Sequence, residues 1–253
     1  MKKTIIFAAS LLALVACNKE VIGTQNVSEV GYLSFDATVE AGVKVETKAV
    51  SESELDAYKV TLSPGWTKTY GEIKGEVFTL ATGSYTVDAE NITPIQAETG
   101  KGNLRIAAPQ QTIEVTANAT AKANLDCVPQ SAAIILDYTD GFKGVFSDYS
   151  FVLTKQDGTK RQDGAVSLSL SEGDTAYYNA ESGSVVLVYT ITGTHNSTGA
   201  KTYSGQITLK RAYSTTVKVD QNSVSGGLKI VLTATNELTG ETQTISVDPY
   251  QNN

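Results

Sequence analysis

The sequence is poor in the residue types from which most metal centres and catalytic triads are built. Among its 253 residues are one histidine, one tryptophan and two cysteines. Zinc sites need several cysteine or histidine ligands, and a Ser-His-Asp triad needs a histidine between two partners. His195, in the polar stretch GTHNSTG, has no second histidine or cysteine near it in the sequence. We therefore expect no metal, no cofactor and no enzymatic activity.

Positive charge is also scarce. Lysine and arginine number 20 against 27 aspartates and glutamates, which gives a formal net charge of −7. An acidic surface is repelled by the phosphates of nucleic acids and by anionic membrane faces. The composition therefore argues against nucleic acid as a partner.

An apolar run follows Lys2 and Lys3 and extends from Ile5 to Ala16. A basic start and a short apolar run that ends in small residues are typical of a secretory signal peptide, and a membrane-spanning helix would need ~20 apolar residues. The end of the run, Leu14-Val15-Ala16-Cys17, resembles the lipobox of bacterial lipoproteins. The resemblance implies that residues 1–16 are removed and that Cys17 carries the lipid, with an acylated new N-terminus.

Two or three acyl chains, at ~0.8 kcal/mol per buried CH₂, hold a protein durably on a membrane. Asn18 replaces the aspartate that would resemble an inner-membrane retention signal, so the resemblance implies an outer-membrane address. Lys19-Glu20 is only weakly similar to the export signals of surface lipoproteins, which leaves the periplasmic and cell-surface leaflets both open.

Cys127 has no partner for an intramolecular disulfide once Cys17 carries lipid. It lies in AKANLDCV on the same alternating face as Ala121, Ala123 and Leu125. We expect a buried structural thiol, and the alternative is a reactive one.

Apolar and polar residues alternate with a period of two through most of the chain. In GYLSFDATV, for example, Leu33, Phe35 and Val39 share one face. The same pattern predicts strands at YKVTL, GSYTVDA, TIEVTA, AAIILDY, YSFVLT, VSLSL, GSVVLVYTIT, TTVKV and GLKIVLTAT. Turn signals such as SPGW, ATGS and STGA separate them. Only SESELDAY, with Ser51 as N-cap and Glu54 three positions later, predicts a helical turn. The pattern indicates an all-β protein of antiparallel sandwiches.

The strand pattern repeats along the chain. Each half contains a strand that ends in a small-residue turn (ATGS or ESGS), then a Thr-Gly hairpin (ETGKGN or STGA), then a closing pair of strands. The division falls near Cys127–Gln130, where Pro129 interrupts the pairing run. We predict two tandem β-sandwich domains, at 30–127 and 128–253, after a lipidated linker at 17–29.

The phrase LATGSYTVDAEN resembles the strand-turn-strand of transthyretin-like domains. Together with the lipobox, GYLSF at the first strand and VETKAV before the second, it makes the chain similar to lipoproteins of Bacteroides-type bacteria, in an uncharacterised family related to the fimbrillins. The resemblance implies transthyretin/Ig-like sandwiches and other fimbrial or surface proteins as partners. It also implies polymerisation by donor-strand exchange, in which one subunit's extended segment completes the next subunit's sheet.

Many pilin subunits lose an N-terminal stretch at a basic residue, and Lys48, in VETKAV, is the position that the resemblance marks for such processing. Lys48 follows the GYLSF strand and replaces the usual arginine, so an ordinary surface lysine is the simpler interpretation. At the other end, ETQTISVDPYQNN is a candidate final strand, free to pair with a partner.

Trp66, the one tryptophan, lies with Tyr70 in SPGWTKTYGEI. An exposed aromatic pair can stack on a sugar ring, so both residues are candidate carbohydrate contacts. The alternative is that Trp66 closes the end of a sandwich core. Of the adjacent Tyr177 and Tyr178, we expect one to face inward.

Aspartates gather in the second half of the chain: Asp137, Asp140, Asp148, Asp157 and Asp163. A glycosidase would need two carboxylates ~5–9.5 Å apart, and calcium wants 6–8 oxygen ligands. Asp-Gly turns explain DYTDG and QDGTKRQDG better. The sequence thus predicts a lipid-anchored envelope protein with a structural or adhesive role, as an accessory or anchor subunit of a fimbria-like assembly. A surface glycan-binding lipoprotein is the alternative.

Overall fold

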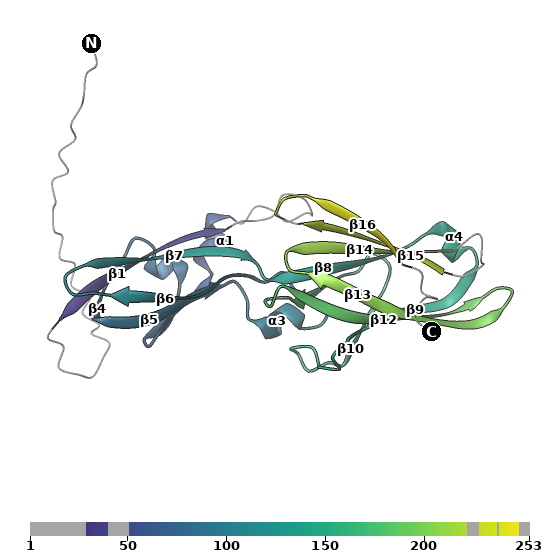
Figure 1. The fold of residues 1–253 in the computed structure, drawn as a ribbon, viewed down its shortest axis with the longest axis horizontal. Coiled ribbons are helices and arrows are strands. Elements are labelled where there is room, and N and C mark those ends of the chain that lie inside the picture. Colours follow the sequence, from purple (N-terminus) through teal and green to yellow (C-terminus); the bar gives the residue numbers. More distant parts are fainter. Residues whose placement is uncertain (1–28, 40–50, 222–227, 237, 248–253) are drawn as a thin grey trace, which may run out of the picture.

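In the computed structural model, residues 29–39, 51–221, 228–236 and 238–247 are described. Cys17, the predicted signal peptide at 1–16 and Lys48 lie outside these described residues, so signal-peptide removal, lipidation and processing stay predictions. Figure 1 shows an elongated molecule with the earlier strands at one end and the later strands at the other.

The strands of the first half are β1 (Val30–Val39), β2 (Lys59–Ser63), β3 (Trp66–Thr69), β4 (Val77–Ala81), β5 (Gly83–Glu90), β6 (Ile106–Val115) and β7 (Thr120–Pro129). The strands of the second half are β8 (Ser131–Tyr138), β9 (Phe146–Lys155), β10 (Ser167–Leu170), β11 (Thr175–Asn179), β12 (Ser184–His195), β13 (Gly199–Lys210), β14 (Tyr213–Gln221), β15 (Leu228–Asn236) and β16 (Thr242–Val247). The described helices are α1 (Glu52–Asp56), α2 (Tyr70–Ile73), α3 (Pro94–Glu98) and α4 (Asp140–Lys143).

The strand pairing of the first half is repeated in the second. The first half has the order β3-β2-β5-β6 followed by β7-β1-β4, and the second has β10-β9-β12-β13 and, separately, β14-β8-β11. In each half the first strand pairs in parallel with the seventh, β1 with β7 and β8 with β14. The repeat seen in the sequence is thus present in the topology, with Gln130 alone between β7 and β8.

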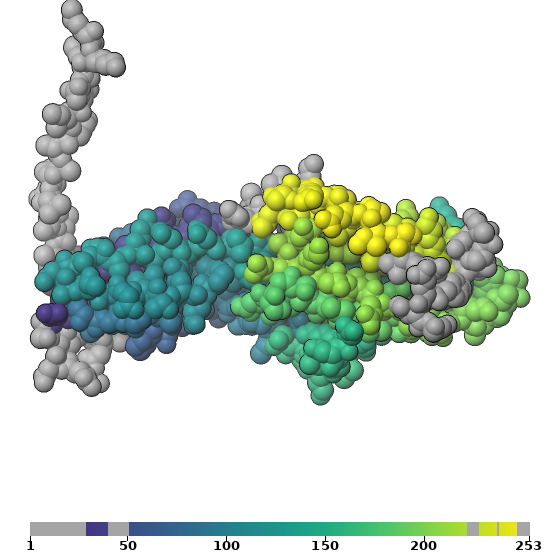
Figure 2. All heavy atoms as spheres, viewed as in Figure 1, coloured from purple at the N-terminus to yellow at the C-terminus, as the bar shows by residue number. Residues whose placement is uncertain are grey.

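The two halves differ in whether their two sheets are joined by hydrogen bonds. In the first half, Ile106–Pro129 and Ala107–Val128 pair β6 with β7 and join the two sheets into one. In the second half the equivalent strands β13 and β14 belong to separate sheets, and β15 and β16 extend the sheet beyond β14. Figure 2 shows β15 and β16, in yellow, on the outside of the second half.

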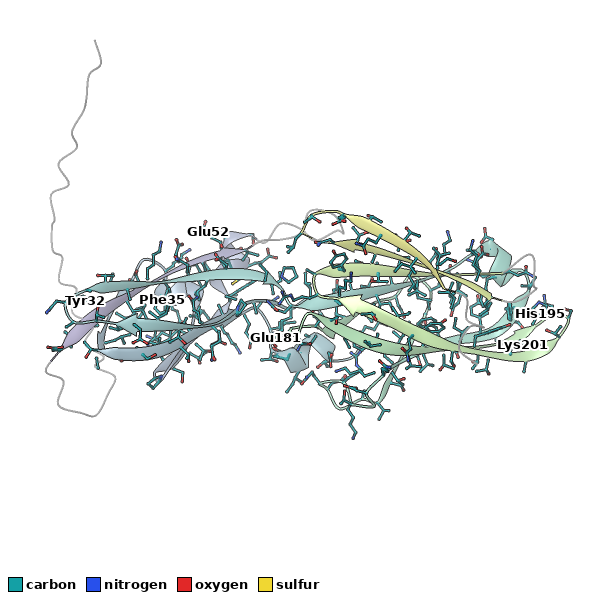
Figure 3. All side chains as sticks on the ribbon, viewed as in Figure 1. Tyr32, Phe35, Glu52, Glu181, His195 and Lys201 are labelled. Carbon is teal, nitrogen blue, oxygen red and sulfur yellow. The ribbon has the colours of Figure 1, made fainter. Side chains whose placement is uncertain are left out.

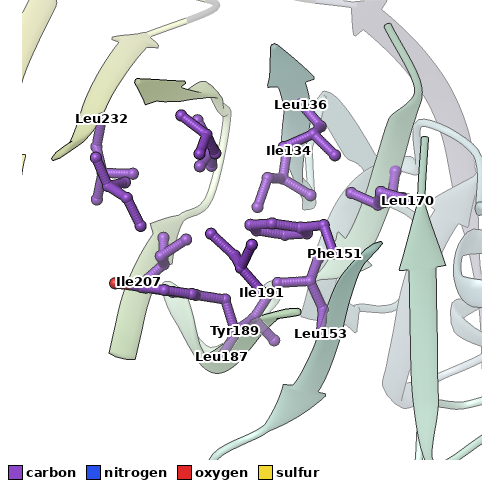
Figure 4. Close-up of a cluster of buried hydrophobic side chains, with 14 of the residues drawn as sticks. Ile134, Leu136, Phe151, Leu153, Leu170, Leu187, Tyr189, Ile191, Ile207 and Leu232 are labelled. Carbon is purple, nitrogen blue, oxygen red and sulfur yellow. The ribbon is translucent and has the colours of Figure 1, made fainter. Parts of the chain in front are cut away.

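Each half has a hydrophobic cluster of its own. The first includes Leu33, Val60 and Leu125, and the second includes Phe151 and Tyr189, whose rings are stacked with centroids 6.0 Å apart. Figure 4 shows the second cluster, which is formed by side chains from both facing sheets. Full burial of one large apolar side chain stabilises a fold by roughly 1.5–3 kcal/mol. The all-β prediction is confirmed; the domain count, the boundaries and the transthyretin/Ig-like type stay predictions.

The helical turn predicted at Ser51 is present. The Ser51 Oγ accepts a hydrogen bond from the Glu54 backbone N–H, and the Glu54 carboxylate accepts one from the Ser51 N–H at 2.7 Å, which forms a capping box. The expectation that this is the only helix is wrong, because capping motifs at Thr69, Thr93 and Thr139 begin α2, α3 and α4. The turn signal TDG therefore lies in the first turn of a helix.

Two further expectations need correction. ETGKGN does not form a hairpin: Pro94 and the Thr93–Gln96 capping box begin α3 just before it, and the segment continues as a loop. In the described part of the C-terminal segment, Thr242–Val247 is a strand as predicted, but one edge already pairs with β15. It is therefore not wholly free for a partner.

Candidate functional site at the junction of the two halves

The connection between the two halves is held by hydrogen bonds on both sides. Gln130 donates its backbone N–H to the Arg105 carbonyl at 2.8 Å, and its own carbonyl accepts from the Ala180 N–H at 2.8 Å. Ser131 Oγ accepts from the Arg105 N–H at 3.0 Å. A one-residue connection with satisfied backbone groups restricts bending between the halves.

Helix α3 and the loop that follows it, residues 94–104 of the first half, lie against the edge strand β11 of the second. Tyr177 donates its N–H to the Lys101 carbonyl at 2.8 Å, so the loop continues the hydrogen bonding of the sheet beyond β11. Gly102 has φ +83°, and a Cβ there would lie 2.3 Å from the Ala97 carbonyl oxygen. Only glycine fits this close approach.

Glu98, at the end of α3, is fully buried and forms an ion pair with Lys155 of β9, Oε2 to Nζ 3.2 Å. Its Oε1 accepts from the Asn179 N–H at 3.0 Å, and its Oε2 also accepts from the Gln162 N–H. The Glu98 carbonyl accepts from Arg161, whose guanidinium lies over an aromatic ring of β11. A buried ion pair needs such additional hydrogen bonds to compensate for lost hydration.

Arg105 forms a second bridge between the halves. Its side chain is almost fully buried and contacts Glu90 of β5, Nη2 to Oε2 2.9 Å. Its Nη1 contacts Glu181 of the second half at 3.1 Å and donates to Asn179 Oδ1 at 3.4 Å. Figure 3 shows Glu181 at the narrow middle of the molecule. The two halves are thus joined by a set of charged and hydrogen-bonded side chains, which we call the lock. Its carboxylates, Glu90, Glu98 and Glu181, all form ion pairs within it.

A pocket of about 300 Å³ lies beside this lock, between the end of β9 and the start of β12. Its lining side chains are mostly polar and uncharged: Lys155, Gln156, Asp157, Thr159, Asn179, Ser182, Ser184, Val185 and Val186. Lys155 is the residue that the pocket shares with the ion pair to Glu98. The pocket is open on one side to solvent and is large enough for a small polar ligand.

The candidate carbohydrate contacts Trp66 and Tyr70 are not brought together as an exposed platform. Tyr70 is buried, and its hydroxyl accepts from the Ala37 N–H at 3.2 Å. Trp66 is half-buried and packs on Phe35 and Phe78, with ring centroids 5.6 and 5.1 Å away. This is the core-closing arrangement that the sequence left as the alternative; carbohydrate contact at these two residues stays a prediction.

The aspartates of the second half are distributed over turns and separate strands. Asp137 lies on β8 and is 3.8 Å from Lys218, whereas Asp148 lies on β9 with φ +49°. Asp157 and Asp163 accept hydrogen bonds from backbone N–H groups two residues later, as Asp-Gly turns require. No group of three acidic, histidine or cysteine side chains suited to a metal occurs in the described ranges.

The other aromatic and histidine candidates have structural surroundings. Tyr178 is buried, and Tyr177 is half-buried, as the alternation predicts. His195 lies far from the junction, at the outer end of the β12–β13 hairpin, with its ring 4.9 Å from that of Phe146. Its Nδ1 accepts from the Ser197 N–H at 3.2 Å.

Cys127 is a buried free thiol, as expected, and burial raises its pKa to about 11 from an ordinary 9.0. At pH 8 this leaves roughly 100-fold less thiolate than in the unfolded chain. In the chain from Asn18 onward, in which Cys127 is the one cysteine, we expect iodoacetamide to react at least ~100-fold more slowly in buffer than in ~8 M urea. Similar rates in both conditions would contradict a buried structural thiol.

The sequence reasoning missed the lock. A signal for α3 was available, because Thr93, Pro94 and Gln96 have the spacing of a capping box with proline at the first helical position. The partners of Glu98 and Arg105 were not accessible from the sequence, since Lys155 and Glu181 follow them by more than 50 residues. Within the described residues, no helix has the length and apolar character needed to cross a membrane.

The geometry defines an elongated all-β protein whose two sandwich-like halves are joined by a buried polar junction. A family model described as "Domain of unknown function (DUF4493)" matches residues 29–249, and the chain belongs to this family. The predicted membership of a family without an assigned function is thereby confirmed. Among curated protein sequences, none matches the chain.

Several solved structures are similar to this chain. The fimbrial anchor protein Mfa2 from Porphyromonas gingivalis shares 12% identity over 83% of this chain and 97% of its own, with a TM-score of 0.40. A candidate cell adhesion protein from Bacteroides eggerthii shares 13% over 87% and 95%, with a TM-score of 0.42. A fimbrial assembly protein from Parabacteroides distasonis shares 12% over 85% and 98%, with a TM-score of 0.37.

Proposed function

We propose that this protein is a lipid-anchored component of the outer membrane with a structural or adhesive role, and that it serves as an anchor or accessory subunit of a fimbria-like assembly. The supporting observation is the placement of the two ends. The first described strand, which follows the lipobox, begins at one end of the long molecule, and the β12–β13 hairpin ends at the other. A lipid at Cys17 would let the second half extend away from the membrane.

The locked junction suits such a role, because an anchor or adhesin must present its outer end at a defined distance. In this proposal the two hydrophobic clusters are the cores of two transthyretin/Ig-like domains. The protein acts without catalysis, and its partners are other fimbrial or surface proteins. Strand edges that are unpaired among the described residues, such as the outer edge of β13, offer backbone groups for partner strands.

Replacing Cys17 with serine tests the anchor. We expect C17S to leave the outer-membrane fraction and appear in the soluble fraction or the medium, because acyl chains supply the membrane affinity. Fractionation and surface labelling of intact cells measure this, with Cys127→Ser as the matched cysteine control. Fibres, where formed, should be shed from C17S cells and retained by control cells.

Retention of C17S in the outer membrane would contradict lipid anchoring. Unchanged cell adherence and unchanged fibre attachment in C17S cells would contradict the structural or adhesive role.

A further inference from the structure

The pocket beside the junction presents hydrogen-bonding groups that the fold does not use. The side chains of Gln156 and Ser184 have no hydrogen-bond partner among the residues that the structure describes. Asn179 accepts from Arg105 through Oδ1, which leaves its Nδ2 free to donate. Amide and hydroxyl groups of this kind donate to and accept from the hydroxyls of a ligand. Val186, on the outward side of β12, supplies an apolar side chain.

The charges at the pocket are already compensated or lie at its rim. Lys155 is paired with the buried Glu98. Asp157 is exposed, and hydrogen bonds from the Thr159 side chain and backbone hold its pKa below the usual value, so it stays ionised at neutral pH. An anionic ligand would be repelled by Asp157 and by the acidic surface as a whole. The pocket therefore favours an uncharged, polar ligand.

The outward face of the sheet β10-β9-β12-β13 continues from the pocket and has no charged side chain over most of its area. The uncharged outward positions, which alternate with the buried residues of each strand, are Ser150, Val152, Thr154, Ser167, Ser169, Val186, Val188, Thr190, Thr192, Thr202, Ser204, Gln206 and Thr208. The charge at the pocket end of this face is Lys210, which pairs with Ser184 in register and has its Nζ 5.8 Å from the centroid of the Tyr213 ring. Val186 belongs to both the pocket and this face. We call the uncharged residues the neutral face.

The neutral face is unusual for this chain. The outward face of β1 and β7 instead carries charges on diagonally neighbouring positions, with Lys122 3.0 Å from Asp36 and with Asp126 further along. On the neutral face, hydroxyls pair with one another, Ser150 with Thr192 at 2.7 Å and Thr190 with Ser204 at 3.4 Å. Such rows of hydroxyl and methyl groups match a ligand that alternates C–H and O–H groups.

We propose that the pocket and the neutral face together bind an uncharged oligosaccharide, with the end of the sugar chain in the pocket and the following units along β12. This inference rests on the proposed adhesive role and names its ligand class. Gln156, Ser184 and Asn179 hydrogen-bond the terminal sugar, Val186 contacts its C–H groups, and Val188 contacts those of a following unit. The site is separate from Trp66 and Tyr70, which lie in the first half.

The test uses the chain from Asn18 onward, which retains every described residue. Probes are maltohexaose, cellohexaose, mannohexaose and chitohexaose, with hexagalacturonate as the charged comparison, each titrated by calorimetry. We expect at least one neutral hexasaccharide to bind with a Kd below about 1 mM and hexagalacturonate to bind more weakly. Gln156→Ala combined with Ser184→Ala should weaken binding by about tenfold or more, because two hydrogen bonds are lost.

Val188 lies half-buried on the central strand β12, so Val188→Glu places a charge in the middle of the neutral face and should abolish measurable binding. Matched controls lie in the first half: Val77→Glu on an exposed strand position, and Gln110→Ala combined with Ser84→Ala. Both controls should bind as the unmodified chain does, and circular dichroism verifies that every variant folds. Absence of binding by all four neutral probes, equal effects of test and control variants, or preference for hexagalacturonate would each overturn the inference.

A second measurement, the adherence of cells that display the protein, distinguishes failure of this inference from failure of the proposed function. Adherence that depends on Cys17 but not on Val188, without oligosaccharide binding, would overturn the inference and leave the adhesive role intact. Adherence lost in Val188→Glu cells, with no probe bound, would make the neutral face a protein-binding surface and also overturn it. Binding of a neutral probe by a chain that confers no adherence would support the site and contradict the adhesive role.

Discussion

Replacing Glu98 with alanine is expected to lower the free energy of unfolding by about 3–5 kcal/mol. The carboxylate is fully buried, and its loss leaves the Lys155 ammonium, 12% exposed, without its counter-charge. The N–H groups of Gln162 and Asn179 lose their acceptor in the same step. Urea unfolding of the chain from Asn18 onward, followed by circular dichroism, measures the change.

The matched control for Glu98→Ala is Asp36→Ala. Asp36 also pairs with a lysine, Lys122 at 3.0 Å, but both side chains are 55% exposed. Exposed pairs contribute about 0–1 kcal/mol, so this variant should unfold almost as the unmodified chain does. Equal losses in the two variants would show that the junction pair contributes no more than a surface pair.

Gly102→Ala is expected to destabilise the junction by about 2–4 kcal/mol. Gly102 has φ +83°, and an added Cβ would lie 2.3 Å from the Ala97 carbonyl oxygen and 2.8 Å from the Tyr177 carbonyl oxygen. The clash involves backbone of both halves, so the loop has to leave β11 to relieve it. Hydrogen exchange at the Tyr177 amide, which donates to Lys101, should become faster together with the drop in unfolding free energy.

Gly100→Ala is the control for this substitution. Gly100 also has positive φ, +62°, but an added Cβ there meets nothing within 4 Å. Gly100→Ala should lower the free energy of unfolding by about 1 kcal/mol, because only the positive φ is unfavourable for alanine there. If Gly100→Ala and Gly102→Ala were equally destabilised and the Tyr177 amide stayed protected in both, the tight contact between the halves would be contradicted.

Period-two alternation was sufficient to predict most strands, because one face of each strand packs on a core. GYLSFDATV places Leu33 and Phe35 in the core of the first half, as its pattern predicts. Helices α2, α3 and α4 were missed because each has only about one turn, too short for a helical period, although the Thr93–Gln96 capping box of α3 was legible. ETGKGN was misread because a Thr-Gly step fits a hairpin and a loop equally well.

The junction and the pocket depend on contacts that no local pattern contains. Lys155 follows the alternating segment YSFVLT, so the sequence predicts only that it ends a strand. Nothing near it in the sequence indicates a buried carboxylate partner from the other half. The pocket combines residues near 155–159 with residues near 179–186, which only the pairing of β9 with β12 brings together. Composition led us to expect no metal, cofactor or catalytic site, but it could not locate a surface whose distinguishing property is its lack of charge.

The parallel pairing of β1 with β7 has a mechanical consequence. The pairs run from Tyr32–Thr120 to Val39–Cys127, and β7 leads through Gln130 directly into the second half. Tension between a tethered N-terminus and a load on the second half would pull the start of β1 and the end of β7 in opposite directions along their shared axis. The hydrogen bonds of a parallel pair are evenly spaced along the strands. Under shear they carry the force simultaneously and do not break one at a time. In the proposed lipid-anchored arrangement, the strand order would therefore load the first half in shear, which a parallel pair of strands resists.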